Sequence, residues 1–288
     1  MFRFIKRMVL FLLLFAVLLL GVTGYAYFIE PDLLRVKCLS IRTEKEVRPC
    51  KIVFFTDTHF GQYYSESHVE DIVGKINERD ADFVIFGGDL LDNYARDRNS
   101  LDMEYLEDKL SEMQAAAGKY AVWGNHDYGG GAVRIYEELM TSCGFELLTN
   151  ESRLFEEYGI TIRGYDDYLM GWTDPSLYAI ESDYFHVIAS HEPVISKFIE
   201  NGSDNFLLSG HTHGGQVTIP FVTSKLLPEG SGTFRKGFYS AKKIGTSTSL
   251  QMYVSDGIGM TRYPFRFLNI PEIVEVNILP AKWENTDL

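Results

Sequence analysis

Short clusters of aspartate, asparagine and histidine recur along this chain in a fixed order. They are Asp57-Thr58-His59, Gly88-Asp89, Gly124-Asn125-His126-Asp127, the single His191 and Gly210-His211-Thr212-His213. Their carboxylate, amide and imidazole groups suit manganese, iron or zinc, and the set contains no thiolate. Asp89 is the carboxylate placed to bridge two ions, because only a carboxylate offers two anionic oxygens. The clusters therefore predict a two-metal site.

Each cluster follows an apolar run that predicts a buried β-strand. These runs are Ile52 to Phe55, Phe83 to Phe86, Tyr120 to Trp123, Val187 to Ala189 and Phe206 to Leu208. A buried strand that ends in such a loop presents polar side chains at one edge of a sheet. We therefore expect the strands to bring the clusters together.

Apolar residues at helical spacing predict helices between these strands. The expected helices are Ser67 to Asn77, Leu101 to Ala117 (closed by Gly118), Gly131 to Cys143 (closed by Gly144), Pro175 to Ser182 and Pro193 to Gly202. Further expected strands are Leu33 to Ile41, Phe145 to Leu148, Ile160 to Arg163 and, in a second sheet, Gln251 to Val254 and Ile273 to Ile278, with a loop at Arg42 to Cys50. Alternating strands and helices followed mostly by strands predict an α/β fold of two packed sheets with helices outside.

The ordered motifs resemble those of the calcineurin-like metallophosphoesterase superfamily, over about Leu33 to Leu279. The string from Gly210 to Gln216, Ser255 to Gly259 and Pro271-Glu272 resemble a membrane-anchored bacterial branch, which includes cell-envelope phosphoesterases and lipid-precursor hydrolases. The resemblance implies a four-layer α-β-β-α sandwich of two mixed sheets with metals at the strand ends. An arginine often stands where this chain has Asp256, so we assign no phosphate contact to that position.

The resemblance also implies a role for each site residue. One metal would be held by Asp57, His59, Asp89 and His213, and the other by Asp89, Asn125, His191 and His211. A bridging water, deprotonated near neutral pH, would be the nucleophile. His126 would stabilise negative charge or protonate the leaving oxygen, and Asp92 would orient it, unless Asp92 instead caps or solvates a loop. Asp127 is expected to fix its loop by accepting hydrogen bonds from backbone N–H groups.

Polar residues outside these motifs have simpler expected roles. His68 is expected on a solvated helix face and His186 in a strand. The glycines at 129–131 lack the Lys and Ser/Thr of a P-loop and predict a flexible turn that borders the substrate or merely leads into a helix. Arg262, Tyr263 and Arg266 lie in a late loop that could meet the substrate, with surface solvation as the expected role of both arginines.

Composition narrows the class of protein and the class of partner. The 288 residues are 45% hydrophobic, which is enough for one large core, and carry a formal net charge of −13. An acidic surface repels nucleic-acid backbones, and no Lys/Arg cluster appears in the soluble region, so no nucleic-acid partner is expected. Cys38, Cys50 and Cys143 are expected to be small buried or half-buried residues, and a Cys38–Cys50 disulfide stays open.

The amino terminus predicts a membrane helix. Met8 to Ile29 contains no charged residue, and a bilayer-spanning helix needs about 20 residues. Positively charged Arg3, Lys6 and Arg7 precede the stretch, which places the domain outside the cytoplasm by the positive-inside rule. We expect a retained anchor at residues 1–30 and an enzymatic domain at 31–288. A cleaved signal peptide is the alternative, but no convincing small-x-small cleavage site follows the apolar core.

Three functions fit these observations. The first is a membrane-anchored phosphoesterase (phosphodiesterase or phosphatase) that uses two divalent metal ions, expected to be manganese, with iron or zinc as alternatives. The second is a pyrophosphohydrolase acting on a lipid precursor such as UDP-2,3-diacylglucosamine, although an outward domain would not meet a cytoplasmic nucleotide. The third is a metal-binding scaffold without turnover, which requires the loss of a ligand or of His126, and the sequence shows neither loss.

Overall fold

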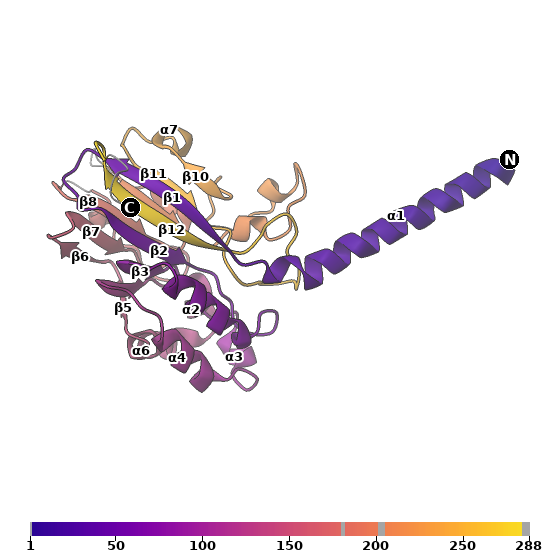
Figure 1. The fold of residues 1–288 in the computed structure, drawn as a ribbon, viewed down its shortest axis with the longest axis horizontal. Coiled ribbons are helices and arrows are strands. Elements are labelled where there is room, and N and C mark those ends of the chain that lie inside the picture. The colour runs from indigo at the N-terminus through magenta and orange to yellow at the C-terminus, as the bar shows by residue number, and fades with distance from the viewer. Residues whose placement is uncertain (1, 180–181, 201–204, 284–288) are drawn as a thin grey trace.

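The computed structural model describes residues 2–179, 182–200 and 205–283. Two six-stranded sheets pack face to face, with helices on their outer faces (Figure 1). Both sheets contain parallel and antiparallel neighbours. The predicted sandwich of two mixed sheets is therefore confirmed.

The first sheet has the strand order β1-β12-β2-β3-β4-β5. Its strands are β1 (Arg35–Thr43), β12 (Glu272–Pro280), β2 (Cys50–Phe55), β3 (Phe83–Phe86), β4 (Gly118–Ala121) and β5 (Phe145–Leu147). From β2 to β5 all neighbours are parallel, whereas β12 runs antiparallel to β2 and parallel to β1. The carboxyl ends of β2, β3 and β4 therefore lie at the same edge.

The second sheet has the strand order β10-β11-β9-β8-β7-β6. Its strands are β10 (Gly237–Tyr239), β11 (Gln251–Val254), β9 (Asn205–Ser209), β8 (Phe185–Ala189), β7 (Ile160–Gly164) and β6 (Glu151–Phe155). The four central strands are parallel, and β10 and β6 run antiparallel at the two edges. The ends of β8 and β9 therefore meet at one edge as well.

The alternating side chains of each strand divide between two apolar layers. In β2, Ile52 and Phe54 pack between the sheets, where they join Val187 and Phe206 of the second sheet. The intervening residue Val53 faces outward. This period of two follows from the pleat, which points successive side chains to opposite faces. The layer between the sheets fixes their relative position.

Amphipathic helices cover the outer face of the first sheet. These helices are α2 (Val69–Asn77), α4 (Met103–Ser111) and α6 (Tyr136–Ser142). Their apolar residues, such as Ile72 and Leu106, pack with Val53 and Val84 in one buried cluster. The second sheet is covered more thinly, by the 3₁₀ helix η5 (Pro193–Lys197) and by α7 (Ala241–Ile244).

Two expected helices are shorter than predicted. The helix at Leu101 to Ala117 is wrong beyond Ser111, because the backbone N–H of Ala117 bonds to the Asp82 carbonyl at the start of β4. Gly118 is accordingly the first residue of β4. Within Gly131 to Cys143, a 3₁₀ turn comes first and the α-helix begins only at Tyr136.

The strand predicted at Ile273 to Ile278 exists, but its assignment to the second sheet was wrong. It is β12, which lies between β1 and β2 of the first sheet. Most of its side chains are buried, as expected for an internal strand covered on both faces. The loop predicted from Arg42 was also placed too early, because β1 continues to Thr43 to pair with Pro280.

Several short elements had no counterpart in the prediction. They are α3 (Tyr94–Asp97), α5 (Asn125–Gly129), strands β6 and β10, α7 and the 3₁₀ helices η1 (Glu30–Asp32), η6 (His213–Gly215) and η7 (Thr223–Lys225). The 3₁₀ helices η2 (Glu66–His68) and η3 (Ala132–Arg134) instead lie at the starts of the helices expected at Ser67 to Asn77 and Gly131 to Cys143. The helix expected from Pro175 is the 3₁₀ turn η4 (Pro175–Leu177), and its residues 180–181 lie outside the described residues. The end of the helix expected from Pro193, at residues 201–202, lies outside them too.

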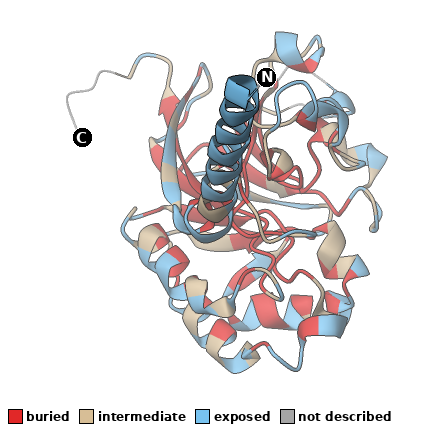
Figure 2. Ribbon diagram, turned by 90° about the vertical axis from the view of Figure 1, so that its right-hand side faces the viewer, coloured by how far each residue is buried: buried red, intermediate tan, exposed pale blue. Residues whose placement is uncertain are grey.

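The amino-terminal helix α1 (Phe2–Phe28) projects from the sandwich and is exposed along most of its length (Figure 2). It is long and apolar enough to cross a membrane. Its last turn is held by the domain: Ala26 is buried, its carbonyl accepts the Arg266 N–H at 3.0 Å, and Tyr27 lies edge-on to Phe265 with ring centroids 5.5 Å apart. The Glu30 carboxylate accepts hydrogen bonds from the N–H groups of Leu268 and Asn269.

The three cysteines are all described, and each is free. Cys50 and Cys143 are buried, as expected, and burial raises the pKa of the Cys143 thiol to about 11. Cys38 is exposed on β1, where a buried or half-buried position had been expected. The open possibility of a Cys38–Cys50 disulfide is not realised in this structure.

The layer between the sheets predicts a large effect for Phe54→Ala. Phe54 is fully buried there, so the truncation should lower the free energy of unfolding by about 3–5 kcal/mol. Urea denaturation of the full chain in detergent, followed by tryptophan fluorescence, measures this change. Leu154→Ala, at an exposed position, serves as the control and should change stability by less than about 0.5 kcal/mol. A loss below about 1 kcal/mol for Phe54→Ala would contradict a tightly packed layer at this position.

Candidate metal centre

Five strand ends converge on one buried site. The ends of β2, β3 and β4 deliver Asp57 and His59, Asp89, and Asn125 in α5, and the ends of β8 and β9 deliver His191, His211 and His213. All seven predicted ligand residues are thus brought together. The first sheet supplies the carboxylates and the second supplies three of the four histidines, so the site lies across both sheets.

Left-handed backbone conformations are concentrated at this site. Asp57, His59, Asp89, His211 and His213 all have φ between 43° and 68°. Such values are uncommon for residues with a Cβ and are typical of functional sites whose surroundings impose them. The turns direct consecutive polar side chains into one centre instead of along a strand. A Cβ at Gly210 would collide with the Asp57 carboxylate, so this approach requires glycine.

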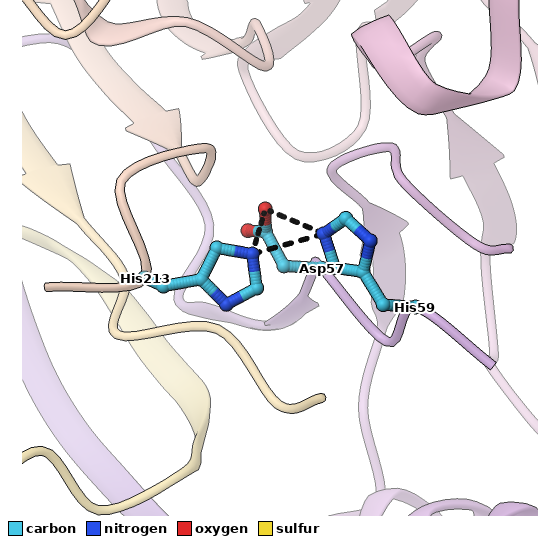
Figure 3. Close-up of side chains that lie close together, drawn as sticks. All are labelled: Asp57, His59 and His213. Carbon is cyan, nitrogen blue, oxygen red and sulfur yellow. Dashed lines mark hydrogen bonds and ion pairs between the residues drawn. The ribbon is translucent and has the colours of Figure 1, made fainter. Parts of the chain in front are cut away.

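Asp57, His59 and His213 form the first group of possible ligands (Figure 3). The Nε2 atoms of the two histidines lie 2.9 Å apart and point toward each other. Asp57 Oδ1 lies 3.3 Å from His213 Nε2 and 3.8 Å from His59 Nε2. Two imidazole nitrogens and a buried carboxylate facing one point form a donor set suited to a divalent transition-metal ion.

Asp89 lies between this group and the second one. Its Oδ2 is 3.3 Å from His59 Nε2 on one side and 3.1 Å from His191 Nε2 on the other. Burial disfavours its charged form, but His191 and His126 outweigh burial and hold the pKa of Asp89 well below its usual value. A charged carboxylate therefore stands where both groups can share it.

The second group shows contacts that a cation would satisfy. His191 donates from Nδ1 to the Gly87 carbonyl at 2.7 Å, which leaves its buried Nε2 without a hydrogen-bond partner among the described residues. His211 donates from Nε2 to the Glu229 carbonyl at 2.6 Å, so in the neutral ring Nδ1 carries only a lone pair. This lone pair faces the Asn125 side-chain oxygen at 2.9 Å. Acceptors facing each other in this way fit a metal site, with the outer ring nitrogens fixed by carbonyls.

Asp127 fixes its loop by accepting a hydrogen bond from a backbone N–H group, as predicted, and it also binds the loop after β3. Its carboxylate accepts hydrogen bonds from the backbone N–H groups of Asp89, Leu90 and Gly124 at 2.8–3.0 Å. Burial, and then the neighbouring charge of Asp89, raise the pKa of Asp127 to about 8. Asp127 thus fixes the loops after β3 and β4 to one another and does not line the pocket.

His126 lies beside the ligand residues and borders the pocket. Its ring stands at 89° to that of His59, with centroids 4.6 Å apart. Nδ1 is 2.6 Å from the backbone carbonyl of Asp92, which can only accept, so Nδ1 carries the proton. A neutral ring therefore leaves Nε2 unprotonated, and the doubly protonated ring is the form that could donate a proton there.

Asp92 orients His126 through its backbone more than through its carboxylate. The Asp92 Oδ1 atom lies 3.6 Å from His126 Nδ1, but 3.3 Å from His59 Nδ1. Thr261 and Arg96 donate to the same carboxylate at 2.7 and 2.6 Å. The carboxylate therefore supports His59, a role that the spacing of three residues from Asp89 did not reveal.

Arg266 corrects the expectation of surface solvation. Its side chain is fully buried and donates to the backbone carbonyls of Gly259, Asp256 and Asn269 at 2.7–3.0 Å. Its Nη2 also lies 3.3 Å from His213 Nδ1. Nothing in the sequence distinguishes this arginine from an exposed one, because its partners are carbonyls of its own and a neighbouring loop.

Asp167 and Glu192 form a buried pair of carboxyl groups that the sequence did not predict. Both are fully buried, and Glu192 groups with His191 and His211, whose potential ligand atoms lie within 4.8 Å of one another. Burial, and then the charge of Asp167, raise the pKa of Glu192 well above its usual value, against the effect of His191. The only sequence signal was the position of Glu192 directly after a candidate ligand.

The other singled-out residues lie at the edge of the site or outside it. His186 is buried in β8, and His68 is half-buried beside Tyr64, each away from the metal centre. Asp256 forms ion pairs with Arg35 and Lys236 at 3.3 and 3.1 Å. Because this chain has a carboxylate where an arginine often stands, the position supplies no cation to the pocket. The glycines at 129–131 end α5 and start η3, as the predicted turn requires.

A pocket of about 430 Å³ opens directly over the metal centre. His59, Asp89 and Asn125 form one wall, and Arg262 and Tyr263 lie at its edge. The segment 217–228 also lines the pocket, mostly with apolar side chains. Gln216, which precedes this segment, bonds the backbone of Thr261 and Tyr263 and so ties it to the loop of Arg262. The pocket therefore joins a charged end to an apolar one.

Comparisons with known proteins agree with this geometry. The family model described as calcineurin-like phosphoesterase matches residues 50–215. The metallophosphoesterase YkuE of Bacillus subtilis is 32% identical over 261 residues, which are 88% of each chain. The phosphodiesterase YaeI of Escherichia coli is 24% identical, over 89% of this chain and 92% of its own. A transmembrane protein with metallophosphoesterase domain from Danio rerio is 27% identical over 96% of this chain, which spans 63% of that protein.

The matched range contains every strand end that contributes to the metal centre, from Asp57 to His213. The match covers more than half of the chain, and the Bacillus relative aligns over nearly all of its length. The chain therefore belongs to the calcineurin-like phosphoesterase family and is a metal-dependent phosphoric ester hydrolase.

Proposed function

We propose that this protein is a membrane-anchored phosphodiesterase whose seven clustered side chains hold two divalent metal ions. The convergence of oxygen and imidazole donors around Asp89 Oδ2 is the observation that carries the proposal. One ion would be held by Asp57, His59, Asp89 and His213, and the other by Asp89, Asn125, His191 and His211. The donor set suits manganese, with iron or zinc as alternatives.

Bound ions would supply Lewis-acid stabilisation of the phosphoryl oxygens and lower the pKa of a water molecule. The chain itself supplies the remaining functions. His126, held at Nδ1 by the Asp92 carbonyl, presents Nε2 to the ester and, when protonated, can donate to the leaving oxygen. Asp92 supports His59 and so positions a ligand, while Asp127 fixes the loops from which Asp89 and His126 extend.

Activity on diesters is supported by the pocket and by a relative. A monoester needs space for one substituent, whereas a diester needs space for two, and the pocket extends from the metal centre along an apolar wall. The Escherichia coli relative is named a phosphodiesterase. A scaffold without turnover is disfavoured, because the described site retains every predicted ligand and His126.

Helix α1 would anchor the protein in the membrane, with residues 1–30 as the anchor and 31–288 as the enzymatic domain. Arg3, Lys6 and Arg7 lie at its amino-terminal end, and the positive-inside rule would retain that end in the cytoplasm. The catalytic domain would then face outward. This topology disfavours a cytoplasmic nucleotide-linked lipid such as UDP-2,3-diacylglucosamine as the substrate.

Asp89→Asn should lose metal and activity together, because a neutral amide bridges two cations poorly. The wild-type full chain in detergent should bind two metals and hydrolyse bis-p-nitrophenyl phosphate faster than the monoester, with manganese, zinc and magnesium compared. Mutating a residue that hydrogen-bonds to a metal ligand typically costs roughly 10–100-fold in activity. Because Asp89 is itself proposed as a ligand of both ions, kcat of the variant should fall by more than this. Elemental analysis measures the metal, and Asp71→Asn on the exposed face of α2 is the control. Two bound metals with normal turnover in Asp89→Asn would exclude the bridge.

His126→Ala should keep both metals while kcat falls by about 10²–10⁴-fold on an ester with a poor leaving group. An alkoxide needs protonation as it leaves, whereas p-nitrophenolate is stable as an anion and needs little. The loss should therefore be smaller on the p-nitrophenyl ester. His68→Ala, outside the site, is the control. Equal losses on both esters would indicate charge stabilisation instead of proton donation, and loss of metal would make His126 a ligand.

Reporters fused after Leu288 should reveal the side of the membrane on which the domain lies. An outward domain should give an active alkaline phosphatase fusion and a dark green fluorescent protein fusion, because the latter does not fluoresce when exported unfolded. Activity and fluorescence in whole cells measure the two outcomes. The opposite pair of results would place the domain in the cytoplasm and restore the nucleotide-linked lipid as a candidate substrate.

A further inference from the structure

The apolar wall of the pocket continues into exposed apolar side chains. Ile219, Val222 and Leu226 line the pocket and are also exposed to solvent, Leu226 by 73%. Phe221 lies between them in sequence, is 91% exposed and does not line the pocket. We call these four residues the apolar rim. Large apolar side chains gathered at the mouth of a pocket typically mark a contact with another apolar phase.

The apolar rim is tied to the root of α1. The Thr218 N–H donates to the Phe267 carbonyl at 2.8 Å, and the neighbouring Arg266 N–H donates to the Ala26 carbonyl at the end of α1. In Figure 1 the orange segment that contains the rim lies on the side of the domain from which α1 emerges. A surface next to the end of a membrane helix lies at the level of the bilayer surface. The rim is therefore continuous with the proposed anchor.

The charge around the rim differs from that of the whole chain. The segments 217–228 and 260–268 contain no Asp or Glu, although the chain has a formal net charge of −13, and the exposed Glu229 follows the first segment directly. They do contain Lys225 and Arg262, both exposed. Exposed cations beside apolar side chains, with no carboxylates among them, match the anionic surface of a lipid bilayer. Tyr27 at the end of α1 and Tyr263 at the pocket add the amphipathic rings typical of a membrane interface.

We propose that the apolar rim inserts into the bilayer surface beside α1, so that the pocket receives a membrane-resident phosphodiester. The hydrocarbon part of the substrate would lie along Ile219, Val222 and Leu226, and its phosphate would reach the metal centre at the other end of the same pocket. Helix α1 is about 40 Å long at 1.5 Å per residue, enough to cross the bilayer while holding the rim at its surface. This inference rests on the proposed phosphodiesterase function and adds the substrate class.

Depth-dependent quenching tests the membrane contact without requiring activity. The full chain carrying Cys38→Ser, which removes the exposed thiol, receives a single added cysteine by Phe221→Cys or, as the control, Leu154→Cys. Each is labelled with NBD and placed as one copy per nanodisc of phosphatidylcholine and phosphatidylglycerol. A doxyl group near the top of the acyl chains should quench the label at 221 and not at 154, which lies on the edge strand β6.

Equal or absent quenching at the two positions would overturn the membrane contact. The NBD fluorescence at position 221 could instead change only with two copies per nanodisc and without quenching by the doxyl group. That result would assign the rim to a contact between copies and would also overturn the proposal.

A chain-length series tests the substrate class. Methyl and hexadecyl p-nitrophenyl phosphate share one leaving group: water adds to phosphorus, the P–O bond to p-nitrophenolate breaks, and the alkyl phosphate remains. In nanodiscs, kcat/KM should be at least about tenfold higher for the hexadecyl ester, since burying two methylene groups suffices for that factor. Phe221→Asp should reduce this ratio and leave the methyl ester unchanged, because Phe221 lies outside the pocket. Aspartate tolerates the left-handed backbone of this position (φ 65°).

Leu154→Asp is the matched control and should preserve the ratio. Equal kcat/KM for the two esters in the wild type, or a ratio unaffected by Phe221→Asp, would overturn the substrate class while leaving the phosphodiesterase function intact. Hydrolysis of neither ester would contradict the proposed function itself, and the quenching measurement would still decide the membrane contact.

Discussion

The apolar layer between the two sheets is the constraint on which the metal centre depends. No loop contains a complete ligand set, because the first sheet supplies Asp57, His59, Asp89 and Asn125 and the second supplies the remaining three residues. Both sets meet only when the sheets pack with the ends of β2, β3, β4, β8 and β9 at a common edge. Phe54 and Phe206, buried between the sheets, help to hold that alignment. The packing of unreactive apolar side chains therefore determines which polar side chains meet at the site.

Burying several carboxylates together is costly, and the site compensates in two ways. Asp127 is surrounded by backbone donors, and its raised pKa reflects both burial and the charge of Asp89. Asp57 and Asp89 face histidine nitrogens, and Asp57 also accepts the backbone N–H of His211. Uncompensated buried charge is strongly unfavourable, so a centre of this kind favours cations. The buried carboxylates therefore account both for the shifted pKa values at the site and for its proposed affinity for metal ions.

Arg266 connects parts of the molecule with different roles. Its guanidinium bonds carbonyls on both sides of its loop and approaches His213, while its backbone N–H bonds the last turn of α1. The metal centre, the loop at the pocket edge and the root of the amino-terminal helix are therefore held by one buried residue. This arrangement fixes where the pocket opens relative to α1, on which the proposed access from the bilayer depends.

The sequence by itself determined the candidate ligand residues, the strands that carry them and the apolar amino-terminal segment. These features are local: a run of Ile52 to Phe55 followed by Asp57 and His59 specifies a buried strand and its polar end without reference to the rest of the chain. The role of Asp127 was also predictable, because a carboxylate three residues after Gly124 can reach the backbone N–H groups of its own turn.

Only the tertiary structure decided which contacts form between distant segments. The Asp92 carboxylate supports His59 because Thr261 and Arg96 hold it there, and Arg266 is buried because its carbonyl partners surround it. The sheet to which β12 belongs and the apolar rim beside α1 likewise depend on which segments pair in space. The spacing of apolar residues indicates which face of a helix or strand is buried. It does not indicate which other element buries that face, because many helices and strands could pack against the same pattern.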